Sequence, residues 1–452
     1  MGEYHGYTGI VAEVLRKAGV KPGDLVRIRR GDGAEFEGVL MPRYSLSPGP
    51  YVVVKLRNGY NVGVRVDPST SIERVGEVPR GKPGEPMPLV EGPLKPPRER
   101  VMIVGAGGTV ASRIDYETGA VKPYLSVDEL SLSVPELWRY ADIDAMQVFQ
   151  ILSEDMKPSM WSRIVDEVAR AIERGYDGVV VTHGTDTMAY TAAALAFAFH
   201  KGLPVPVALT GAQRSSDRPS SDAAFNLTAA VLTAARAPFA EVVVVMHGET
   251  GDSYALAHRG VRVKKMHSSR RDAFQSVNAP PLAKVLPYEG KIEMIDQRYR
   301  ERGREELVVE NGFHERVALI KHFPGDIASV IDALVDKGFK GIVIEGTGFG
   351  HVSSDAIKSL ERAREEGVAV AIVTQTIFGR VNLNVYSTGR MMLAAGVIPL
   401  EDMTAEAAYA KLSWALARAE SLEEVRRIML TNLAGEMSGR HHLRLYTHTG
   451  RW

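Results

Sequence analysis

Side chains that could attack a carbonyl or carry a proton follow several short apolar runs of the 452-residue chain. Thr109 comes directly after Gly107-Gly108, and Thr185 and Asp186 follow the run at 178–182. A hydroxyl becomes a nucleophile when a neighbouring base accepts its proton, and a carboxylate beside it can complete a proton relay. Taken singly, the Gly-Gly-Thr segment is more typical of a plain tight turn, and Thr185 with Asp186 is more typical of a helix cap.

Two further segments carry suitable groups. Ser153 and Glu154 follow the apolar run at 148–152, and these residue types can hold the ammonium and carboxylate of an amino acid. Lys265 follows Lys264 in a short basic stretch, which alone is typical of a solvated face. Next to a threonine hydroxyl, however, a lysine whose pKa is shifted toward the neutral form can act as the base.

Composition narrows the chemistry. The chain has no cysteine, which excludes thiol nucleophiles, disulfides, Cys-ligated zinc and iron–sulfur clusters. His183 has no partner at zinc-ligand spacing, so we expect a structural role for it and no metal site. Val110 occupies the position where a dinucleotide-binding glycine motif needs Gly or Ala. Catalysis is therefore expected to rest on hydroxyl, carboxylate and amine groups.

Charge and hydropathy indicate where the protein works. The 55 basic side chains equal the 55 acidic ones, which argues against a whole surface dedicated to nucleic acid. The N-terminus lacks a basic stretch followed by an apolar run, and no uncharged stretch reaches the roughly 18 residues of a membrane span. We expect a soluble cytoplasmic protein that does not contact the membrane.

The N-terminal part predicts a small all-β module. Short β-type runs at 25–28, 36–40, 51–56 and 61–66 are separated by turn residues, which favours a small β-barrel over residues 1–76. Residues 77–100 contain seven prolines and predict an extended linker. Three roles remain open for this N-terminal module: docking of another protein, a purely structural role, or contact with RNA.

After the linker, the pattern becomes that of an α/β protein with parallel sheets. The apolar runs are continuous rather than alternating, which is typical of strands buried on both faces; they lie at 101–104, 178–182, 205–210, 242–246, 317–320, 341–345 and 368–374. Helical spacing from Trp161 to Ile172 predicts a helix that Gly175 ends, and Ser421 with Glu424 forms a capping-box pattern. We expect a large domain (101–290), a connection (291–310), a small domain (311–436) and a basic tail (437–452).

In such sheets, ligands bind outside the carboxyl ends of the strands, where the candidate residues lie. Read together, five segments resemble the bacterial-type asparaginase/glutaminase family in order and spacing: GGTVAS (107–112), ILSEDM (151–156), HGTDTM (183–188), LTGAQRSSDRPSSDAAFN (209–226) and the Lys265 stretch ending in FQSVN (274–278). With the GDLVRI segment (23–28) and DYETGAVKPYLS (115–126), the whole chain is similar to the D subunits of archaeal glutamyl-tRNA(Gln) amidotransferases.

The resemblance implies an asparaginase-like two-domain enzyme that acts as a glutaminase and releases ammonia for a partner subunit. That partner would bind the tRNA and use ATP and Mg²⁺, so this chain itself would need no cofactor. By the same resemblance, Thr109 is the nucleophile. Tyr116 lies on a loop that closes over the site, and its role is to activate Thr109. Thr185, Asp186 and Lys265 form the proton relay, and Asp186 also binds the α-ammonium group of glutamine.

The head group of the substrate is expected to contact Ser153 and Glu154, where the family often has glutamine instead of Glu154. The family also implies a homodimer in which a residue of 377–390, with Tyr386 as candidate, completes the neighbouring site. Two alternatives remain open at this point. One is a stand-alone asparaginase that carries an unrelated N-terminal module, and the other is a non-catalytic binding protein built on the same scaffold.

Overall fold

The computed structural model describes residues 7–41, 49–56, 61–77, 99–108, 112–114, 121–123, 134–214 and 221–440. Of the predicted site residues, Thr109 and Tyr116 lie outside these ranges, as does the tail from 441 onward. In the described part, none of the helices has both the length and the apolar character needed to cross a membrane.

The N-terminal module is a five-stranded antiparallel sheet with the order β4-β3-β2-β1-β5, packed around its own core. It comprises α1 (Gly9–Ala18), β1 (Asp24–Arg29), β2 (Glu35–Leu40), β3 (Tyr51–Leu56), β4 (Asn61–Arg65) and β5 (Ser71–Glu77). The four predicted strands are confirmed, whereas α1 and β5 were not predicted. Helix α1 buries Val11 and Leu15 and ends at Gly19, whose φ of 65° suits glycine.

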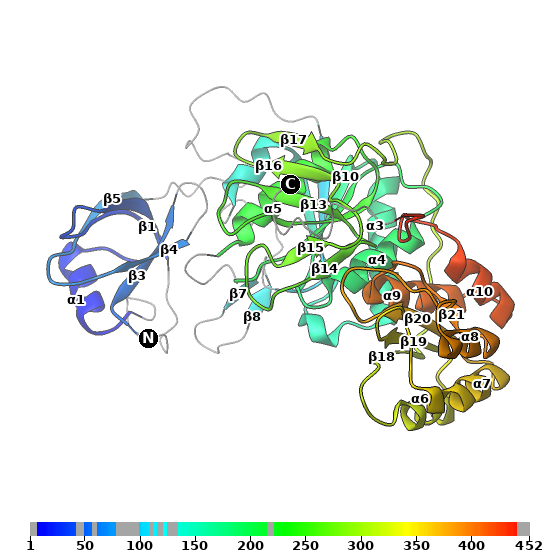
Figure 1. The fold of residues 1–452 in the computed structure, drawn as a ribbon. Coiled ribbons are helices and arrows are strands. Elements are labelled where there is room, and N and C mark those ends of the chain that lie inside the picture. Colours follow the sequence, from blue (N-terminus) through cyan, green and yellow to red (C-terminus); the bar gives the residue numbers. More distant parts are fainter. Residues whose placement is uncertain are drawn as a thin grey trace.

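The large domain contains an eight-stranded sheet with the order β17-β16-β13-β12-β11-β10-β6-β9 (Figure 1). Neighbours from β9 to β12 run parallel, and the remaining strands add antiparallel pairs. The strands are β6 (Arg100–Gly105), β9 (Asp142–Gln147), β10 (Gly178–Thr182), β11 (Val207–Thr210), β12 (Val242–His247), β13 (Ala255–Arg259), β16 (Ala283–Leu286) and β17 (Lys291–Met294). Strand β17 lies inside the stretch predicted as the connection.

The segment before Ser153 differs from the expectation. The apolar run at 148–152 is not a strand, because β9 ends at Gln147 and the chain continues as a loop into the short 3-10 helix η2 (Ser153–Asp155). The amide of Val148 still bonds to the carbonyl of Gly105 at 2.8 Å, so the loop stays beside the end of β6. Ser153 is therefore placed by this loop and not by a strand end.

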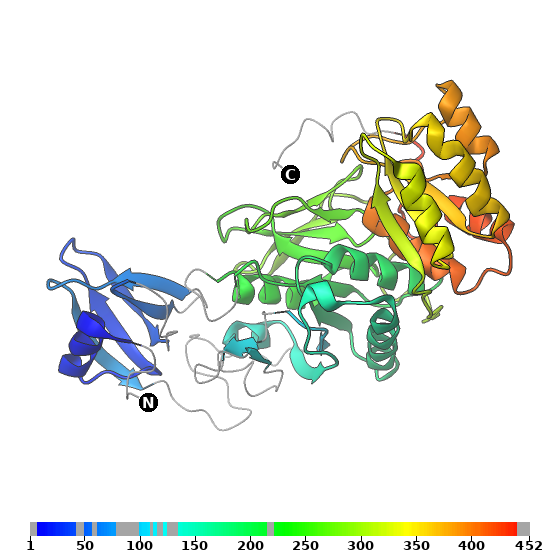
Figure 2. The same ribbon diagram turned by 90° about the horizontal axis from the view of Figure 1, so that it is seen from below.

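Helices cover both faces of the large sheet. α3 (Pro158–Glu173) and α4 (Met188–Ala198) pack on one face, and α5 (Ala223–Arg236) with the 3-10 helix η1 (Pro135–Arg139) packs on the other (Figure 2). Along β6, Met102 and Val104 face the first layer, whereas Val101 and Ile103 face the second. Burial on both faces explains the continuous apolar runs. The predicted helix and its end at Gly175 are confirmed by α3.

The small domain is a four-stranded parallel sheet, β18-β19-β20-β21, with α6 and α7 on one face and α9 on the other (Figure 1). Its elements are β18 (Val317–Lys321), α6 (Ile327–Asp336), β19 (Gly341–Gly346), η3 (Ser354–Ala356), α7 (Ile357–Glu365), β20 (Ala369–Thr374), α8 (Ser387–Ala394), β21 (Ile398–Pro399), α9 (Ala405–Leu416) and α10 (Leu422–Leu430). The remaining strands form two hairpins: β7 (Ser112–Ile114) with β8 (Val121–Pro123), and β14 (Val263–Lys265) with β15 (Phe274–Ser276).

The two α/β domains share one hydrophobic core. Residues of α9, such as Ala408 and Leu412, belong to the same buried cluster as α4 and as Val343 of β19. α9 therefore packs between α4 of the large domain and the sheet of the small domain. At α10, the Ser421 hydroxyl accepts a hydrogen bond from the amide of Glu424 at 3.2 Å, which confirms the predicted cap. The predicted α/β class with an additional N-terminal β-module is confirmed.

Candidate active site

The carboxyl ends of three neighbouring parallel strands lie level, because Thr182 of β10 pairs with Gly105 of β6 and with Thr210 of β11. Just beyond β6, the backbone approaches its neighbours very closely. A Cβ atom on Gly107 would lie 2.5 Å from the carbonyl oxygen of Ile151, and one on Gly108 would lie 2.6 Å from the amide nitrogen of Gly184. Both glycines also have positive φ, so only glycine fits this turn, and Thr109 follows it in sequence.

Lys265, Thr185 and Asp186 form one hydrogen-bonded cluster. Lys265 Nζ lies 2.8 Å from Thr185 Oγ1 and 2.7 Å from Asp186 Oδ1. The Thr185 side chain is buried, the Lys265 side chain is only 13% exposed, and the Asp186 side chain is 67% exposed. The hydroxyl and the amine are thus sheltered from water, while the carboxylate remains accessible to a ligand.

Ser153 joins this cluster through Asp186. Its buried hydroxyl donates to Asp186 Oδ2 at 3.2 Å and lies 3.5 Å from the carboxylate of the exposed Glu154. The hydrogen bond from Lys265 lowers the pKa of Asp186 below its ordinary value; partial burial opposes this effect, and the Lys265 charge and the Ser153 hydroxyl add to it. Asp186 is therefore a carboxylate anion over the neutral pH range, as a binding site for an ammonium group requires.

A buried chain of hydrogen bonds supports the loop that carries Thr185. Trp161 Nε1 donates to the Thr191 hydroxyl at 3.0 Å, which lies 2.9 Å from His183 Nε2. Since the carbonyl of Gly184 can only accept, its 2.7 Å contact with His183 Nδ1 places the proton on Nδ1 and leaves Nε2 to accept from Thr191. Burial lowers the pKa of His183 to about 4, so the ring is neutral. This arrangement agrees with the structural role expected for His183.

A second polar network, absent from the sequence analysis, supports the loop after β11. The carboxylate of Asp222 accepts from the amides of Gln213 and Arg214 at 3.0 and 2.9 Å. Asn226 bonds to Asp222 and to the carbonyl of Gly211, and its side-chain oxygen accepts from the amide of His247. Apart from His247, these residues belong to the segment at 209–226, but their partners follow only from the packing of α5 against β11 and β12.

The remaining candidate, Tyr386, belongs to the small domain and is 58% exposed. Its ring packs edge-on against His351, with centroids 5.3 Å apart, and not against the Lys265 cluster. For the described ranges, no group of three or more His, Asp or Glu side chains is arranged to hold a metal ion. The structure thus brings together Ser153, Thr185, Asp186 and Lys265, with Glu154 beside Ser153.

Three family models match consecutive parts of the chain. Residues 20–75 match the GatD N-terminal domain, residues 100–300 match Asparaginase, N-terminal, and residues 316–429 match the Glutaminase/Asparaginase C-terminal domain. All the clustered residues lie within the match at residues 100–300. Among solved structures, the thermostable L-asparaginase from Thermococcus kodakarensis is 35% identical with a TM-score of 0.67, covering 75% of this chain and 100% of its own.

Two curated relatives match almost the whole chain. The D subunit of glutamyl-tRNA(Gln) amidotransferase from Aeropyrum pernix is 70% identical over 425 residues, covering 94% of this chain and 100% of the relative. The D subunit of the same enzyme from Pyrococcus abyssi is 55% identical over 432 residues, covering 95% of this chain and 97% of the relative. The chain therefore belongs to the family of glutamyl-tRNA(Gln) amidotransferase D subunits.

Proposed function

We propose that this chain is the glutaminase component of a tRNA-dependent amidotransferase. It hydrolyses glutamine and supplies the ammonia with which a partner subunit converts Glu-tRNA(Gln) to Gln-tRNA(Gln). The observation that carries this proposal is the contact of Lys265 with Thr185 and Asp186, next to the glycine turn that precedes Thr109. The family membership of the whole chain, including its N-terminal module, supports the link to tRNA.

An amide is a poor electrophile, so a strong nucleophile is required. The hydroxyl oxygen of Thr109 attacks the side-chain carbonyl carbon of glutamine, and Tyr116 accepts its proton. As the carbon–nitrogen bond breaks, the leaving nitrogen takes up the proton that Tyr116 received from Thr109 and departs as ammonia, which leaves a γ-glutamyl ester on Thr109. Water then attacks this ester and releases glutamate, and the threonine hydroxyl is restored.

The cluster around Lys265 binds the substrate and moves protons. Asp186 is ionised and exposed, so it binds the α-ammonium group of glutamine, with Ser153 and Glu154 beside the head group. The buried Thr185 hydroxyl connects Lys265 to the reacting atoms and passes protons between them during ester hydrolysis. Lys265, in its deprotonated form, thus acts as the base of the second half-reaction.

The partner subunit carries the remaining steps. Activation of the glutamyl ester requires ATP and Mg²⁺, which we assign to the partner together with most tRNA contacts. The equal numbers of acidic and basic residues in this chain fit that division, because RNA-binding surfaces usually carry excess positive charge. Glutamine is then the only small substrate that this chain binds.

A homodimer through the asparaginase-like domains is part of the proposal. Five large apolar side chains of the small domain, each at least 43% exposed, provide a surface for it: Phe349, Ile377, Val385, Tyr386 and Met391. Large apolar side chains that are exposed on a surface can mark protein contacts. Tyr386 would reach the site of the neighbouring copy from this surface.

Ammonia release tests the function. The chain is assayed with glutamine and with asparagine, alone, with its partner subunit, and with partner and Glu-tRNA(Gln). Glutamine hydrolysis should be slow for the chain alone and should become faster when the partner subunit and Glu-tRNA(Gln) are added. The alternative, a stand-alone asparaginase, is favoured by the similarity to the Thermococcus enzyme over 75% of the chain. Asparagine hydrolysis that equals or exceeds glutamine hydrolysis, unaffected by partner and tRNA, would establish that alternative.

A further inference from the structure

Lys265 reaches the cluster on a hairpin of only two strands. In this hairpin, Lys265 of β14 pairs with Phe274 of β15, and the two strands form a separate sheet. A two-stranded ribbon is marginally stable by itself. Burial of Val263 and Phe274 in the main core holds its apolar side. Other contacts must fix the position of the Lys265 amine along the length of the hairpin.

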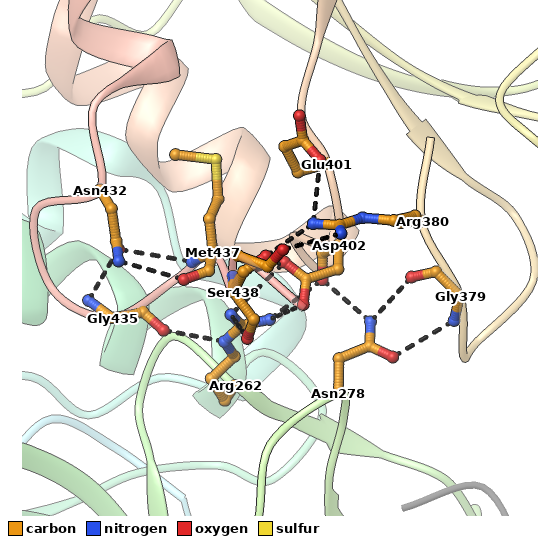
Figure 3. Close-up of polar contacts among 11 residues, drawn as sticks. Arg262, Asn278, Gly379, Arg380, Glu401, Asp402, Asn432, Gly435, Met437 and Ser438 are labelled. Carbon is orange, nitrogen blue, oxygen red and sulfur yellow. Dashed lines mark hydrogen bonds and ion pairs between the residues drawn. The ribbon is translucent and has the colours of Figure 1, made fainter. Parts of the chain in front are cut away.

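Besides the Lys264–Glu406 ion pair and the hydrogen bond between Ser276 and His258 on the strands themselves, such contacts lie at the base of the hairpin, where Arg262 precedes β14. Its fully buried guanidinium donates to the carbonyl of Gly435 at 2.8 Å, to the carbonyl of Asp402 at 3.1 Å and to the Ser438 hydroxyl at 2.7 Å (Figure 3). It also forms an ion pair with the buried Asp402 carboxylate at 3.2 Å. All these partners lie beyond residue 400, so Arg262 joins the hairpin to the small domain and the segment after α10.

Asn278, two residues after β15, makes the matching contacts on the other strand. Its side-chain nitrogen donates to the carbonyls of Gly379 and Asp402 at 3.1 and 2.9 Å, and its oxygen accepts from the amide of Gly379 at 3.2 Å (Figure 3). Its φ of 57° lies in the left-handed region, which asparagine adopts more readily than most residues. Asp402 is thus a shared partner of both ends of the hairpin.

The far side of this junction is itself firmly held. Lys411 and Glu436, both fully buried, form an ion pair, and the Glu436 carboxylate accepts from the amides of Leu433 and Ala434. These bonds fix the segment that presents Gly435 and Ser438 to Arg262. The hairpin is therefore attached to a rigid support, not to a loose tail.

We propose that Arg262 and Asn278 are positioning residues that hold Lys265 at Thr185 by locking the β14–β15 hairpin to the small domain. The inference rests on the proposed function, in which Lys265 is the base. Displacement of a catalytic group by about 1 Å can reduce a rate about 100-fold, so loss of these anchors acts on the chemical step. The small domain thereby fixes the position of Lys265, although none of its own residues belongs to the Lys265 cluster.

Asn278→Gly tests this inference, because glycine keeps the left-handed backbone and leaves the Arg262–Asp402 pair intact. Asn311→Gly is a matched control. Asn311 also joins the two domains and also makes three bonds, to the carbonyl of Ser162, the carboxylate of Asp166 and the amide of Gly312, on the α3 side. Glutamine kinetics are measured with partner and Glu-tRNA(Gln) present, and folding is checked by circular dichroism.

Asn278→Gly should lower kcat at least tenfold with KM within threefold, whereas Asn311→Gly should keep kcat within twofold. Should the glycine variant not fold, Asn278→Asp keeps the acceptor for the Gly379 amide, loses both donated bonds, and should lower kcat in the same way. A kcat within twofold of wild type for a folded Asn278 variant, or an equal loss in both asparagine variants, would overturn the inference. Wild-type inactivity, or full activity of Lys265→Met, would instead refute the proposed function.

Discussion

Lys265 Nζ lies 2.8 Å from Thr185 Oγ1, although 80 positions separate the two residues in the chain. Lys265→Met removes the amine while keeping a side chain of similar length. Because general acid–base groups contribute about 10²–10⁴-fold to a rate, glutamine hydrolysis by the assembled enzyme should fall by about that factor. Lys291→Met, at an exposed lysine of β17, serves as the control and should stay within twofold. A loss below tenfold for Lys265→Met would exclude it as the base.

Asp186→Asn tests how the substrate amine is bound. The amide has the same shape but no charge, and hydrogen bonds to charged groups contribute about 1.5–3 kcal/mol, so KM for glutamine should rise about 10–100-fold. Since the pKa of Asp186 is lowered by its bond to Lys265, protonation of Asp186 should not raise the wild-type KM between pH 5 and pH 8. Steady-state kinetics over this range provide the measurement. An unchanged KM in the variant would show that the ammonium group is bound elsewhere.

His183 should stay neutral well below its ordinary pKa. Burial lowers the pKa from 6.5 to about 4, so protons bind the unfolded chain more readily than the folded one between these values. The His183 contribution to stability is thus complete above pH 6.5 and is lost as the pH falls toward 4, by about 3 kcal/mol in total. Nitrogen-15 NMR of labelled histidine should show the Nδ1–H tautomer down to about pH 5, with His183→Gln identifying the signal. A charged ring at pH 6 would contradict the assigned hydrogen bonds.

Gly108→Ala should abolish most activity. Gly108 has a φ of +79°, and an added Cβ would lie 2.6 Å from the backbone of Gly184, so the turn must move away from the loop that carries Thr185. Gly303→Ala is the matched control, since its φ of +73° imposes a comparable strain of about 1–3 kcal/mol with nothing within 4 Å of the new atom. We expect at least a 100-fold loss of glutaminase activity for Gly108→Ala and full activity for Gly303→Ala at a temperature where both are folded. Equal activities would show that this close approach is not needed.

The parallel strands were predictable because helices on both faces make their sequences apolar throughout, as in β10 and β12. The antiparallel strand β17 alternates half-buried and exposed residues over four positions, which is too short a pattern to recognise. Helix α1 buries only two residues in its ten. Helix α1 packs against β5, which is distant in the sequence, and β17 pairs with β16 at the edge of the sheet.

The site likewise contains residues that local sequence patterns mark and residues that they do not. Thr185, Asp186 and Lys265 were identifiable because their residue types follow apolar runs in a recognisable order. Asn278 is the last residue of the FQSVN segment, but the sequence indicates no role for it because its partners Gly379 and Asp402 lie more than 100 positions away. Arg262 between two buried valines was a possible signal, since a charged side chain in an apolar run must find a partner. Only the fold identifies that partner as Asp402.

In the proposed reaction Thr109 carries the γ-glutamyl group, and this intermediate can be trapped. The assembled enzyme is mixed with glutamine, quenched in acid during turnover, and digested for mass spectrometry, with Lys265→Met included to slow ester hydrolysis. We expect one γ-glutamyl group on the peptide containing Thr109, at higher occupancy in Lys265→Met, and none in Thr109→Val, which should also be inactive. Turnover by Thr109→Val, or a γ-glutamyl group on any other residue, would contradict this role of Thr109.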